Sequence, residues 1–245
     1  MNAIGVIPAR LHSTRLAKKV LADICGKPML RHVWERAKKA SALDEVIIAT
    51  DEQAVVDAAK RFGAKAVLTS SDHKSGTDRV TEVVNPLDVK VVVNIQADEP
   101  LIHPAMINEL ALALLKAPSL VMATLAKRIT SEQDIHDPNV VKVAIDKEGF
   151  AIYFSRAAIP YNREPQNNVF LTPSHYKHIG IYAYTKDFIF TFTNMPQSKL
   201  EAIEKLEQLR VLENGYRIKV VETAYDTISV DTAEDLTRVR NLLGA

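Results

Sequence analysis

Two hydrophobic periodicities alternate along the first half of the chain. Short runs rich in Val, Ile and Ala, at residues 3–9, 45–50 and 90–96, predict buried strands. Between them, residues 28–39 and 53–62 place apolar side chains at helical spacing. The same reasoning predicts a strand over 65–69 and helices over 77–84 and 104–115. Strand–helix–strand units of this kind predict an α/β protein built on a mostly parallel sheet.

The second half of the chain contains more strands. They are predicted at 120–127, 140–146, 151–155, 179–184 and 218–222, with helices at 200–212 and from Thr232 onward. The spacing from Thr232 to Asp235 fits a capping box. We expect the extra strands to form antiparallel additions to the sheet or a β-rich arm suited to a dimer contact. The Pro- and Asn-rich segment 161–174 is predicted to be a mobile loop.

Composition narrows the class of protein. A chain of 245 residues with 47% hydrophobic residues fits a single large domain, residues 1–245. The net charge of +1 argues against an extended nucleic-acid-binding face, and one cysteine, Cys25, excludes an intrachain disulfide framework. No run approaches the ~20 apolar residues that span a bilayer, and the N-terminus does not resemble a signal peptide. We therefore expect a cytoplasmic protein with neither nucleic acid nor membrane as a partner.

A basic turn follows the first predicted strand. Within ten residues it carries four cations and two hydroxyls: Arg10, Ser13, Thr14, Arg15, Lys18 and Lys19. Ligands of open α/β sheets bind at the carboxyl ends of strands, and Arg and Lys are the side chains that hold phosphate. The turn lacks the glycines of a Walker loop or a dinucleotide fingerprint. Its position favours phosphate binding over a merely solvated loop.

Two aspartates follow apolar segments that are far apart in the chain. Asp98 comes after the predicted strand 90–96, and Asp231 lies just before the last helix. Carboxylates from separate strand ends that converge on one divalent cation are common in phosphoryl chemistry. Each aspartate could instead cap a turn or a helix. Together they predict a shared metal site.

Other polar residues are candidates for substrate contacts. Residues 75–79 (SGTDR) open a helix with a glycine and small hydroxyls, as expected either of a ligand site or of an ordinary helix start. Arg156, after a predicted strand, suits a substrate carboxylate, whereas His178 could equally be structural. In the predicted 200–212 helix, Glu207 and Gln208 point away from an apolar face formed by Leu200, Ile203 and Leu206.

In this order the motifs resemble the 3-deoxy-manno-octulosonate (Kdo) cytidylyltransferases, the CMP-Kdo synthetases, over nearly the whole chain. The matching segments are 7–10 (IPAR), 13–16 (STRL), Lys19, 26–29 (GKPM), 75–79 (SGTDR), 94–96 (NIQ), 98–100 (DEP), 153–156 (YFSR), 178–182 (HIGIY), 206–210 (LEQLR) and 230–232 (VDT). Any one segment is weakly specific, but the ordered set is highly specific.

The resemblance implies a three-layer α/β/α nucleotide-diphospho-sugar transferase fold with a mixed, mostly parallel sheet and a small β-rich arm. It implies a homodimer and the reaction of CTP with Kdo to give CMP-Kdo and diphosphate for lipopolysaccharide biosynthesis. Residues 1–125 would bind the nucleotide, 126–200 the sugar and the dimer partner, and 201–245 would supply closing helices and a metal aspartate.

The family's roles map onto this sequence residue by residue. The resemblance implies that Lys19, Asp98 and Asp231 are catalytic and that the two aspartates hold Mg²⁺. It implies nucleotide contacts from Ala9, Arg10, Ser13, Arg15, Lys19, Ser75, Gly76, Thr77, Arg79 and Gln96. The sugar acid would contact Arg156, His178, Tyr182, Glu207 and Gln208.

Three departures from the family pattern involve four residues. Ala17 and Lys18 replace a Pro-Gly pair before Lys19, while Ala97 and Ala183 each replace a glycine. We expect a stiffer loop in which Lys18 competes with Lys19, and the alanines leave open the choice between Kdo and an 8-amino relative. Further alternatives are a CMP-sialate-type or UTP-dependent enzyme of the same fold and a nucleotide-binding regulator without turnover. A nicotinamide oxidoreductase is disfavoured, because the glycine fingerprint is missing.

Overall fold

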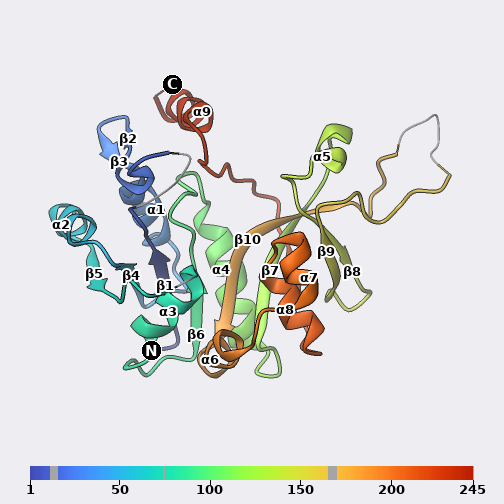
Figure 1. Ribbon diagram of the computed structural model, residues 1–245, viewed down its shortest axis with the longest axis horizontal. Helices are drawn as coiled ribbons and strands as arrows, with labels where there is room; N and C mark the ends of the chain where they lie inside the picture. Colours follow the sequence, from blue (N-terminus) through green and yellow to red (C-terminus); the bar gives the residue numbers. More distant parts are fainter. Residues whose placement is uncertain (12–15, 74, 165–169, 245) are drawn as a thin grey trace.

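The computed structural model describes residues 1–11, 16–73, 75–164 and 170–244. Its main sheet runs in the order β11-β7-β10-β6-β1-β4-β5 (Figure 1). The strands are β1 (Ala3–Pro8), β4 (Glu45–Thr50), β5 (Lys65–Leu68), β6 (Val91–Asn94), β7 (Met122–Arg128), β10 (Tyr176–Thr185) and β11 (Lys219–Glu222). All neighbouring pairs are parallel except those of β10, which runs antiparallel to β6 and β7. The expected mixed, mostly parallel sheet is confirmed.

Helices cover both faces of this sheet. One hydrophobic cluster joins the sheet to α1 (Met29–Ala37), α2 (Gln53–Arg61) and α4 (Pro104–Lys116). A second cluster, on the other face, joins it to α3 (Gly76–Val84), α6 (Lys186–Asn194) and α8 (Gln208–Glu213). Alternate residues of β1 enter the two clusters, as a strand buried on both faces requires. The three-layer α/β/α architecture is therefore confirmed.

Two further groups of elements lie outside these three layers. A short arm is formed by α5 (Glu132–His136), β8 (Lys142–Ile145) and β9 (Ala151–Ser155), and β8 pairs with the start of β10. Beyond the carboxyl end of β1, α9 (Ala233–Gly244) packs on the hairpin of β2 (Asp23–Ile24) and β3 (Lys27–Pro28) (Figure 1). The capping box predicted for α9 is present, since Thr232 and Asp235 exchange hydrogen bonds of 2.8 and 3.2 Å. Among the described residues, no helix is both long and apolar enough to cross a membrane.

One predicted helix is wrong. The periodicity over 200–212 predicts a continuous helix, but the chain forms α7 (Lys199–Glu204) and α8, separated at Lys205. Lys205 adopts a left-handed conformation with φ 56°, which ends α7 and turns the chain. As a result Ile203, expected on the buried face, is 77% exposed, whereas Gln208 is 3% exposed. Helix α6 is absent from the sequence prediction, and of the predicted 161–174 loop, residues 165–169 lie outside the described residues.

Candidate active site

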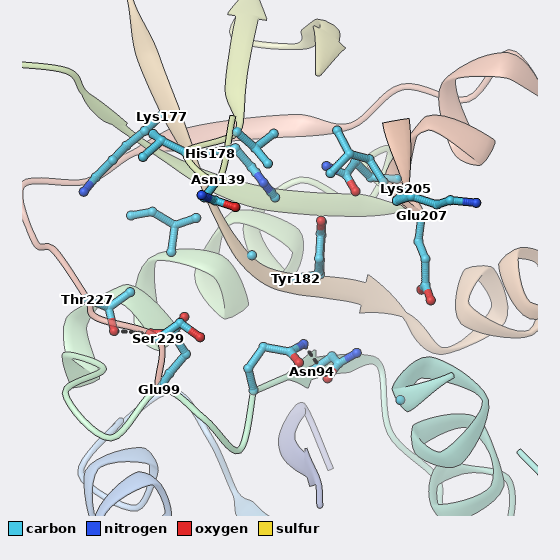
Figure 2. Close-up of a pocket in the computed structure, with 18 of the residues that line it drawn as sticks. Asn94, Glu99, Asn139, Lys177, His178, Tyr182, Lys205, Glu207, Thr227 and Ser229 are labelled. Carbon is cyan, nitrogen blue, oxygen red and sulfur yellow. Dashed lines mark hydrogen bonds between the residues drawn. The ribbon is translucent and has the colours of Figure 1, made fainter. Parts of the chain in front are cut away.

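A cavity of about 540 Å³ opens where β6 ends and α3 begins. Because β10 is antiparallel to β6 and its Tyr182 pairs with Asn94, the first half of β10 extends beyond the end of β6 and forms one wall. The other walls come from the α7–α8 junction and from residues 139–141 and 226–229. Figure 2 shows the Tyr182 hydroxyl and the Glu207 carboxylate entering this space, with Asn94 on the opposite side.

Beside the cavity, Lys19 joins the two predicted metal aspartates. Its Nζ lies 2.7 Å from Asp98 Oδ2 and 3.0 Å from Asp231 Oδ1. A backbone hydrogen bond of 2.9 Å from the Val230 N–H to the Asp98 carbonyl ties the two acidic segments together. Burial alone would lower the pKa of Lys19, but attraction to Asp98 and Asp231 outweighs it and the pKa is raised. The convergence of the two aspartates, separated by 132 intervening residues in the chain, is thus a feature of the fold.

The donor set of this pair fits magnesium. The described residues contain no group of three or more His, Cys, Asp or Glu side chains arranged to hold a metal ion. Magnesium, however, is commonly held by one or two carboxylates together with substrate phosphates and water. Asp98 and Asp231 already face a single cationic group, the Lys19 ammonium. Two carboxylates that share one cation are suited to a Mg²⁺ that arrives with a nucleotide.

Glu99 adds an acidic group next to this pair. It lines the cavity and accepts a hydrogen bond from the Thr227 hydroxyl, marked in Figure 2. Burial raises its pKa to about 7, opposed by that hydrogen bond and reinforced by repulsion from Asp98 and Asp231. Sequence reasoning did not select Glu99, although it directly follows Asp98.

The predicted nucleotide residues divide into two groups. Ser75 caps α3 through a capping box, and a Cβ on Gly76 would lie 3.2 Å from Pro8 Cγ, so α3 begins against the end of β1. Gly76, Thr77 and Gln96 all line the cavity. Arg10 Nη2 donates to the His73 carbonyl at 2.7 Å, and its buried Nε has no hydrogen-bond partner in the described part of the chain. The Arg10 guanidinium therefore keeps donor capacity for an anion.

Arg79 lies away from this cavity. Its side chain is fully buried, and its guanidinium donates to Asp51 Oδ2 at 2.7 Å and to the Thr69 hydroxyl. It is absent from the residues that line the cavity, so its nucleotide contact stays a prediction. Ser13 and Arg15 fall outside the described residues, while Ala9 is buried directly after β1.

Four predicted sugar-site residues lie together on the cavity wall: His178, Tyr182, Glu207 and Gln208. Burial lowers the pKa of His178 to about 3, so its imidazole is neutral near neutral pH. Burial also raises the pKa of Glu207, with attraction to Arg210 opposing the change. The Gln208 Nε2 atom is buried and has no hydrogen-bond partner among the described residues. Such an orphaned donor beside a cavity is suited to a polar ligand.

Arg156, the fifth predicted sugar residue, is engaged elsewhere. Its Nε donates to the Glu204 carbonyl and its Nη1 to the Pro138 carbonyl, each at 2.9 Å. It does not line the cavity, and it instead joins the two segments that carry Asn139 and Lys205, which do. Its contact with a substrate carboxylate stays a prediction.

Sequence reasoning missed two lysines that line the cavity, Lys177 and Lys205. Lys177 is paired with Asp226 at 2.6 Å, a contact that no local sequence signal reveals. Lys205 sits at the break between α7 and α8, and its left-handed conformation is equally invisible to a periodicity argument.

The departures from the family pattern have local explanations. Lys18 takes a left-handed conformation, φ 51°, at the position where the family has glycine, and it is exposed. It is Lys19 that reaches the aspartates. Ala97 and Ala183 are 7% and 0% exposed and belong to the hydrophobic cluster that contains α1, α2 and α4.

Comparisons with known proteins identify the family of this chain. The family model described as "Cytidylyltransferase" matches residues 4–219. A 3-deoxy-manno-octulosonate cytidylyltransferase of Solibacter usitatus is 52% identical over 242 residues, which cover 99% of this chain and 94% of that protein. The structure of a CMP:2-keto-3-deoxy-manno-octonic acid synthetase complexed with CTP superposes with a TM-score of 0.93 at 41% identity, covering 100% of this chain and 99% of the other.

A more distant neighbour supports the fold alone. It is the 4-diphosphocytidyl-2C-methyl-D-erythritol synthase of Anaerococcus prevotii, with a TM-score of 0.63 at 15% identity, covering 100% of this chain and 99% of the other. The family match, the high identity over almost all of the chain and the shared architecture lead to one conclusion. The chain belongs to the cytidylyltransferase family and, within it, to the 3-deoxy-manno-octulosonate cytidylyltransferases.

Proposed function

We propose that this protein transfers a cytidylyl group from CTP to 3-deoxy-manno-octulosonate. The anomeric hydroxyl of the sugar acid attacks the α-phosphorus, an O–P bond forms, the bond to diphosphate breaks, and the hydroxyl proton leaves. The product, CMP-Kdo, would serve lipopolysaccharide biosynthesis. One observation carries the proposal: Lys19, Asp98 and Asp231 meet beside a cavity whose wall carries His178 and Glu207.

The physical difficulty of this reaction is charge. Both substrates are anions, so they repel each other, and diphosphate must leave with a large negative charge. We assign Arg10 and Lys19 to the triphosphate, joined by Arg15 from the basic turn. The donor capacity left on Arg10 supports this assignment. Lys19 now neutralises two carboxylates, so on CTP binding it would turn from them to the phosphates.

Asp98 and Asp231 would then hold Mg²⁺. When bound, magnesium neutralises phosphate charge and acidifies a hydroxyl that it coordinates. The protein's own contribution is to keep the two carboxylates facing one point, through the Val230–Asp98 backbone hydrogen bond and the helix cap at Thr232 and Asp235. An exchange of Lys19 for a divalent cation would couple metal binding to the arrival of the nucleotide.

We place the sugar acid between β10 and the α7–α8 junction. There, His178, Tyr182, Glu207 and Gln208 supply acceptors and donors for a polyhydroxylated ring. Chains of weak contacts link this wall to the nucleotide side, because Thr77 lies 3.5 Å from both Glu207 Oε2 and Asn94 Nδ2. Substrates bound on the two sides would therefore be held in a fixed relation, as an in-line displacement requires.

The family resemblance also supports a homodimer that acts in the cytoplasm, with residues 1–125 binding the nucleotide, 126–200 the sugar and the dimer partner, and 201–245 closing the site. We place the dimer contact on the arm of β8 and β9, where Ile152 is 62% exposed. Sedimentation analysis of the wild type against Ile152→Glu tests this: the wild type should sediment as a dimer and the variant should dissociate. Wild-type monomers would contradict it.

The function is tested by measuring diphosphate release with Mg²⁺ over CTP, UTP, ATP and GTP, each with Kdo, 8-amino-8-deoxy-Kdo or N-acetylneuraminate. We expect release to need CTP and Kdo together. Release that needs UTP, or that needs N-acetylneuraminate in place of Kdo, would assign another nucleotidyltransferase activity. CTP binding without any sugar-dependent release would indicate a regulator and contradict the proposal.

A further inference from the structure

Strand β10 is irregular beside the cavity. Against β7 its register shifts, so that Ile179 pairs with Leu125 but Tyr182, three residues later, pairs with the residue directly before Leu125, Thr124. The residues between them, including Gly180, form a bulge. Bulges redirect side chains beside functional sites. Here the bulge lies between His178 and Tyr182, whose rings are 5.5 Å apart and both line the cavity.

Thr124 is the side chain opposite this bulge, and it is fully buried. Its hydroxyl oxygen lies 2.9 Å from the Ile181 carbonyl oxygen and 3.3 Å from that of Ile179. It also lies 2.9 Å from His178 Nε2. One hydroxyl therefore contacts both ends of the bulge and the imidazole of His178.

The number of donors and acceptors around the Thr124 hydroxyl determines where its hydrogen and that of His178 lie. A carbonyl oxygen only accepts, so the single hydroxyl hydrogen of Thr124 must be donated toward the carbonyls. The hydroxyl oxygen is then an acceptor for His178, and the ring nitrogen Nε2 must carry the hydrogen. In a neutral imidazole the other nitrogen, Nδ1, is left as an acceptor.

The surroundings of His178 support a neutral ring in a fixed orientation. Burial lowers its pKa to about 3. Phe154 packs against it edge to face, with centroids 4.9 Å apart at 75°. His178 is only partly buried and lines the cavity, and among the described residues no hydrogen bond is made to its Nδ1.

We propose that Thr124 is a positioning residue, whose hydroxyl holds His178 as the Nε2–H tautomer so that Nδ1 accepts a hydrogen bond from a hydroxyl of the sugar acid. The identity of the ligand rests on the function proposed above. The tautomer does not, because it follows from the contacts of Thr124 alone. A neutral acceptor can bind a hydroxyl group but cannot donate a hydrogen bond to the substrate carboxylate. His178 therefore recognises a hydroxyl of the sugar and not its negative charge.

Two substitutions separate the hydroxyl from the rest of the side chain. Thr124→Val keeps the shape and removes the hydroxyl, whereas Thr124→Ser keeps the hydroxyl. The matched control is Thr223→Val, since Thr223 is also buried and, among the described residues, its hydroxyl contacts only the backbone N–H of Tyr225. The tautomer is read by long-range ¹H–¹⁵N NMR of the whole protein, with the His178 signals assigned by their loss in His178→Gln.

We expect the wild type and Thr124→Ser to show Nε2–H, and Thr124→Val to show both tautomers. The KM for Kdo should rise about tenfold in Thr124→Val, with the KM for CTP unchanged and no change in Thr223→Val. A wild-type spectrum with hydrogen on Nδ1 would overturn the proposal even if Thr124→Val failed to fold. An unchanged tautomer and KM in folded Thr124→Val would also overturn it. Absence of any Kdo-dependent turnover in the wild type would instead overturn the proposed function.

Discussion

Lys19 has two proposed roles: it pairs with the two aspartates, and it contacts the triphosphate during turnover. Replacing it should strengthen the binding of a divalent cation but slow the reaction. Its ammonium occupies the point that Asp98 and Asp231 share, at 2.7 and 3.0 Å. A divalent cation entering there must first displace it. We therefore expect Lys19→Met to bind Mn²⁺, used as a spectroscopic substitute for Mg²⁺, more tightly than the wild type does while turning over more slowly.

The size of the effect follows from the exposure of the three side chains. Lys19 is 13% exposed, Asp98 27% and Asp231 39%. Exposed ion pairs contribute about 0–1 kcal/mol each and breaking a fully buried one costs about 3–5 kcal/mol. The ion pair of Lys19 with half-buried Asp98 and the more exposed pair with Asp231 should therefore contribute roughly 1–3 kcal/mol together, which an entering cation must overcome. That range corresponds to about 5- to 150-fold in Mn²⁺ affinity.

The assay is an electron paramagnetic resonance titration of free Mn²⁺ without nucleotide. Lys18→Met is the matched control. Lys18 is the exposed neighbour of Lys19, and within the described part of the chain it makes no ion pair with either aspartate. Its affinity should equal that of the wild type. Turnover with CTP and Kdo should fall only in Lys19→Met. Equal or weaker Mn²⁺ binding by Lys19→Met would refute the reasoning.

Three further predictions concern the walls of the cavity and their support. Burial lowers the pKa of His178 to about 3 from an ordinary 6.5, so below pH 6.5 the unfolded chain takes up a proton that the folded protein does not. The stability that His178 contributes is therefore complete above pH 6.5 and decreases as the pH falls. The free energy of unfolding should decrease by about 2 kcal/mol between pH 8 and pH 5. In urea titrations His178→Gln should lack this loss, and equal losses would contradict the prediction. Arg210→Met should cost about 3 kcal/mol in urea unfolding by leaving the Glu201 carboxylate, 5% exposed, without its partner, and Glu201→Gln in the same chain should restore most of it. Arg156→Leu should raise the KM for Kdo about tenfold and leave that for CTP unchanged, and a matching effect of exposed Arg163→Leu would argue against a specific role.

Much of the fold follows from local periodicity. Strand β4 and helix α2 form where the sequence predicts, because each buries a regular apolar pattern and α2 is followed by Gly63 in a left-handed turn. The α7–α8 break was not predictable in this way. Leu200, Ile203 and Leu206 have helical spacing, yet the helix ends at Lys205, which takes a left-handed conformation, and Gln208 is buried. Tertiary packing rather than local periodicity determines this break.

Part of the candidate site could likewise be predicted from local sequence, and part could not. Asp98 and Asp231 could be selected because residues after strands of an open sheet gather at one edge. That Lys19 bridges them, and that Arg79 pairs with Asp51 instead of facing the cavity, depends on distances between segments far apart in the chain. The hydroxyl of Thr124 belongs to the same class. A threonine inside a buried strand carries no local sign that it contacts a histidine 54 residues away.

The most direct measurement is the rate of Kdo-dependent diphosphate release from CTP and Mg²⁺ in Asp98→Asn and Asp231→Asn, with exposed Asp57→Asn as the control. Each neutral amide keeps the shape of the carboxylate but removes its charge from the shared cation. We expect turnover to fall at least 10³-fold in both variants, equivalent to about 4 kcal/mol of transition-state stabilisation, and to stay near the wild-type rate in Asp57→Asn. Near-normal turnover of either variant would contradict the claim that the two aspartates together hold the catalytic metal.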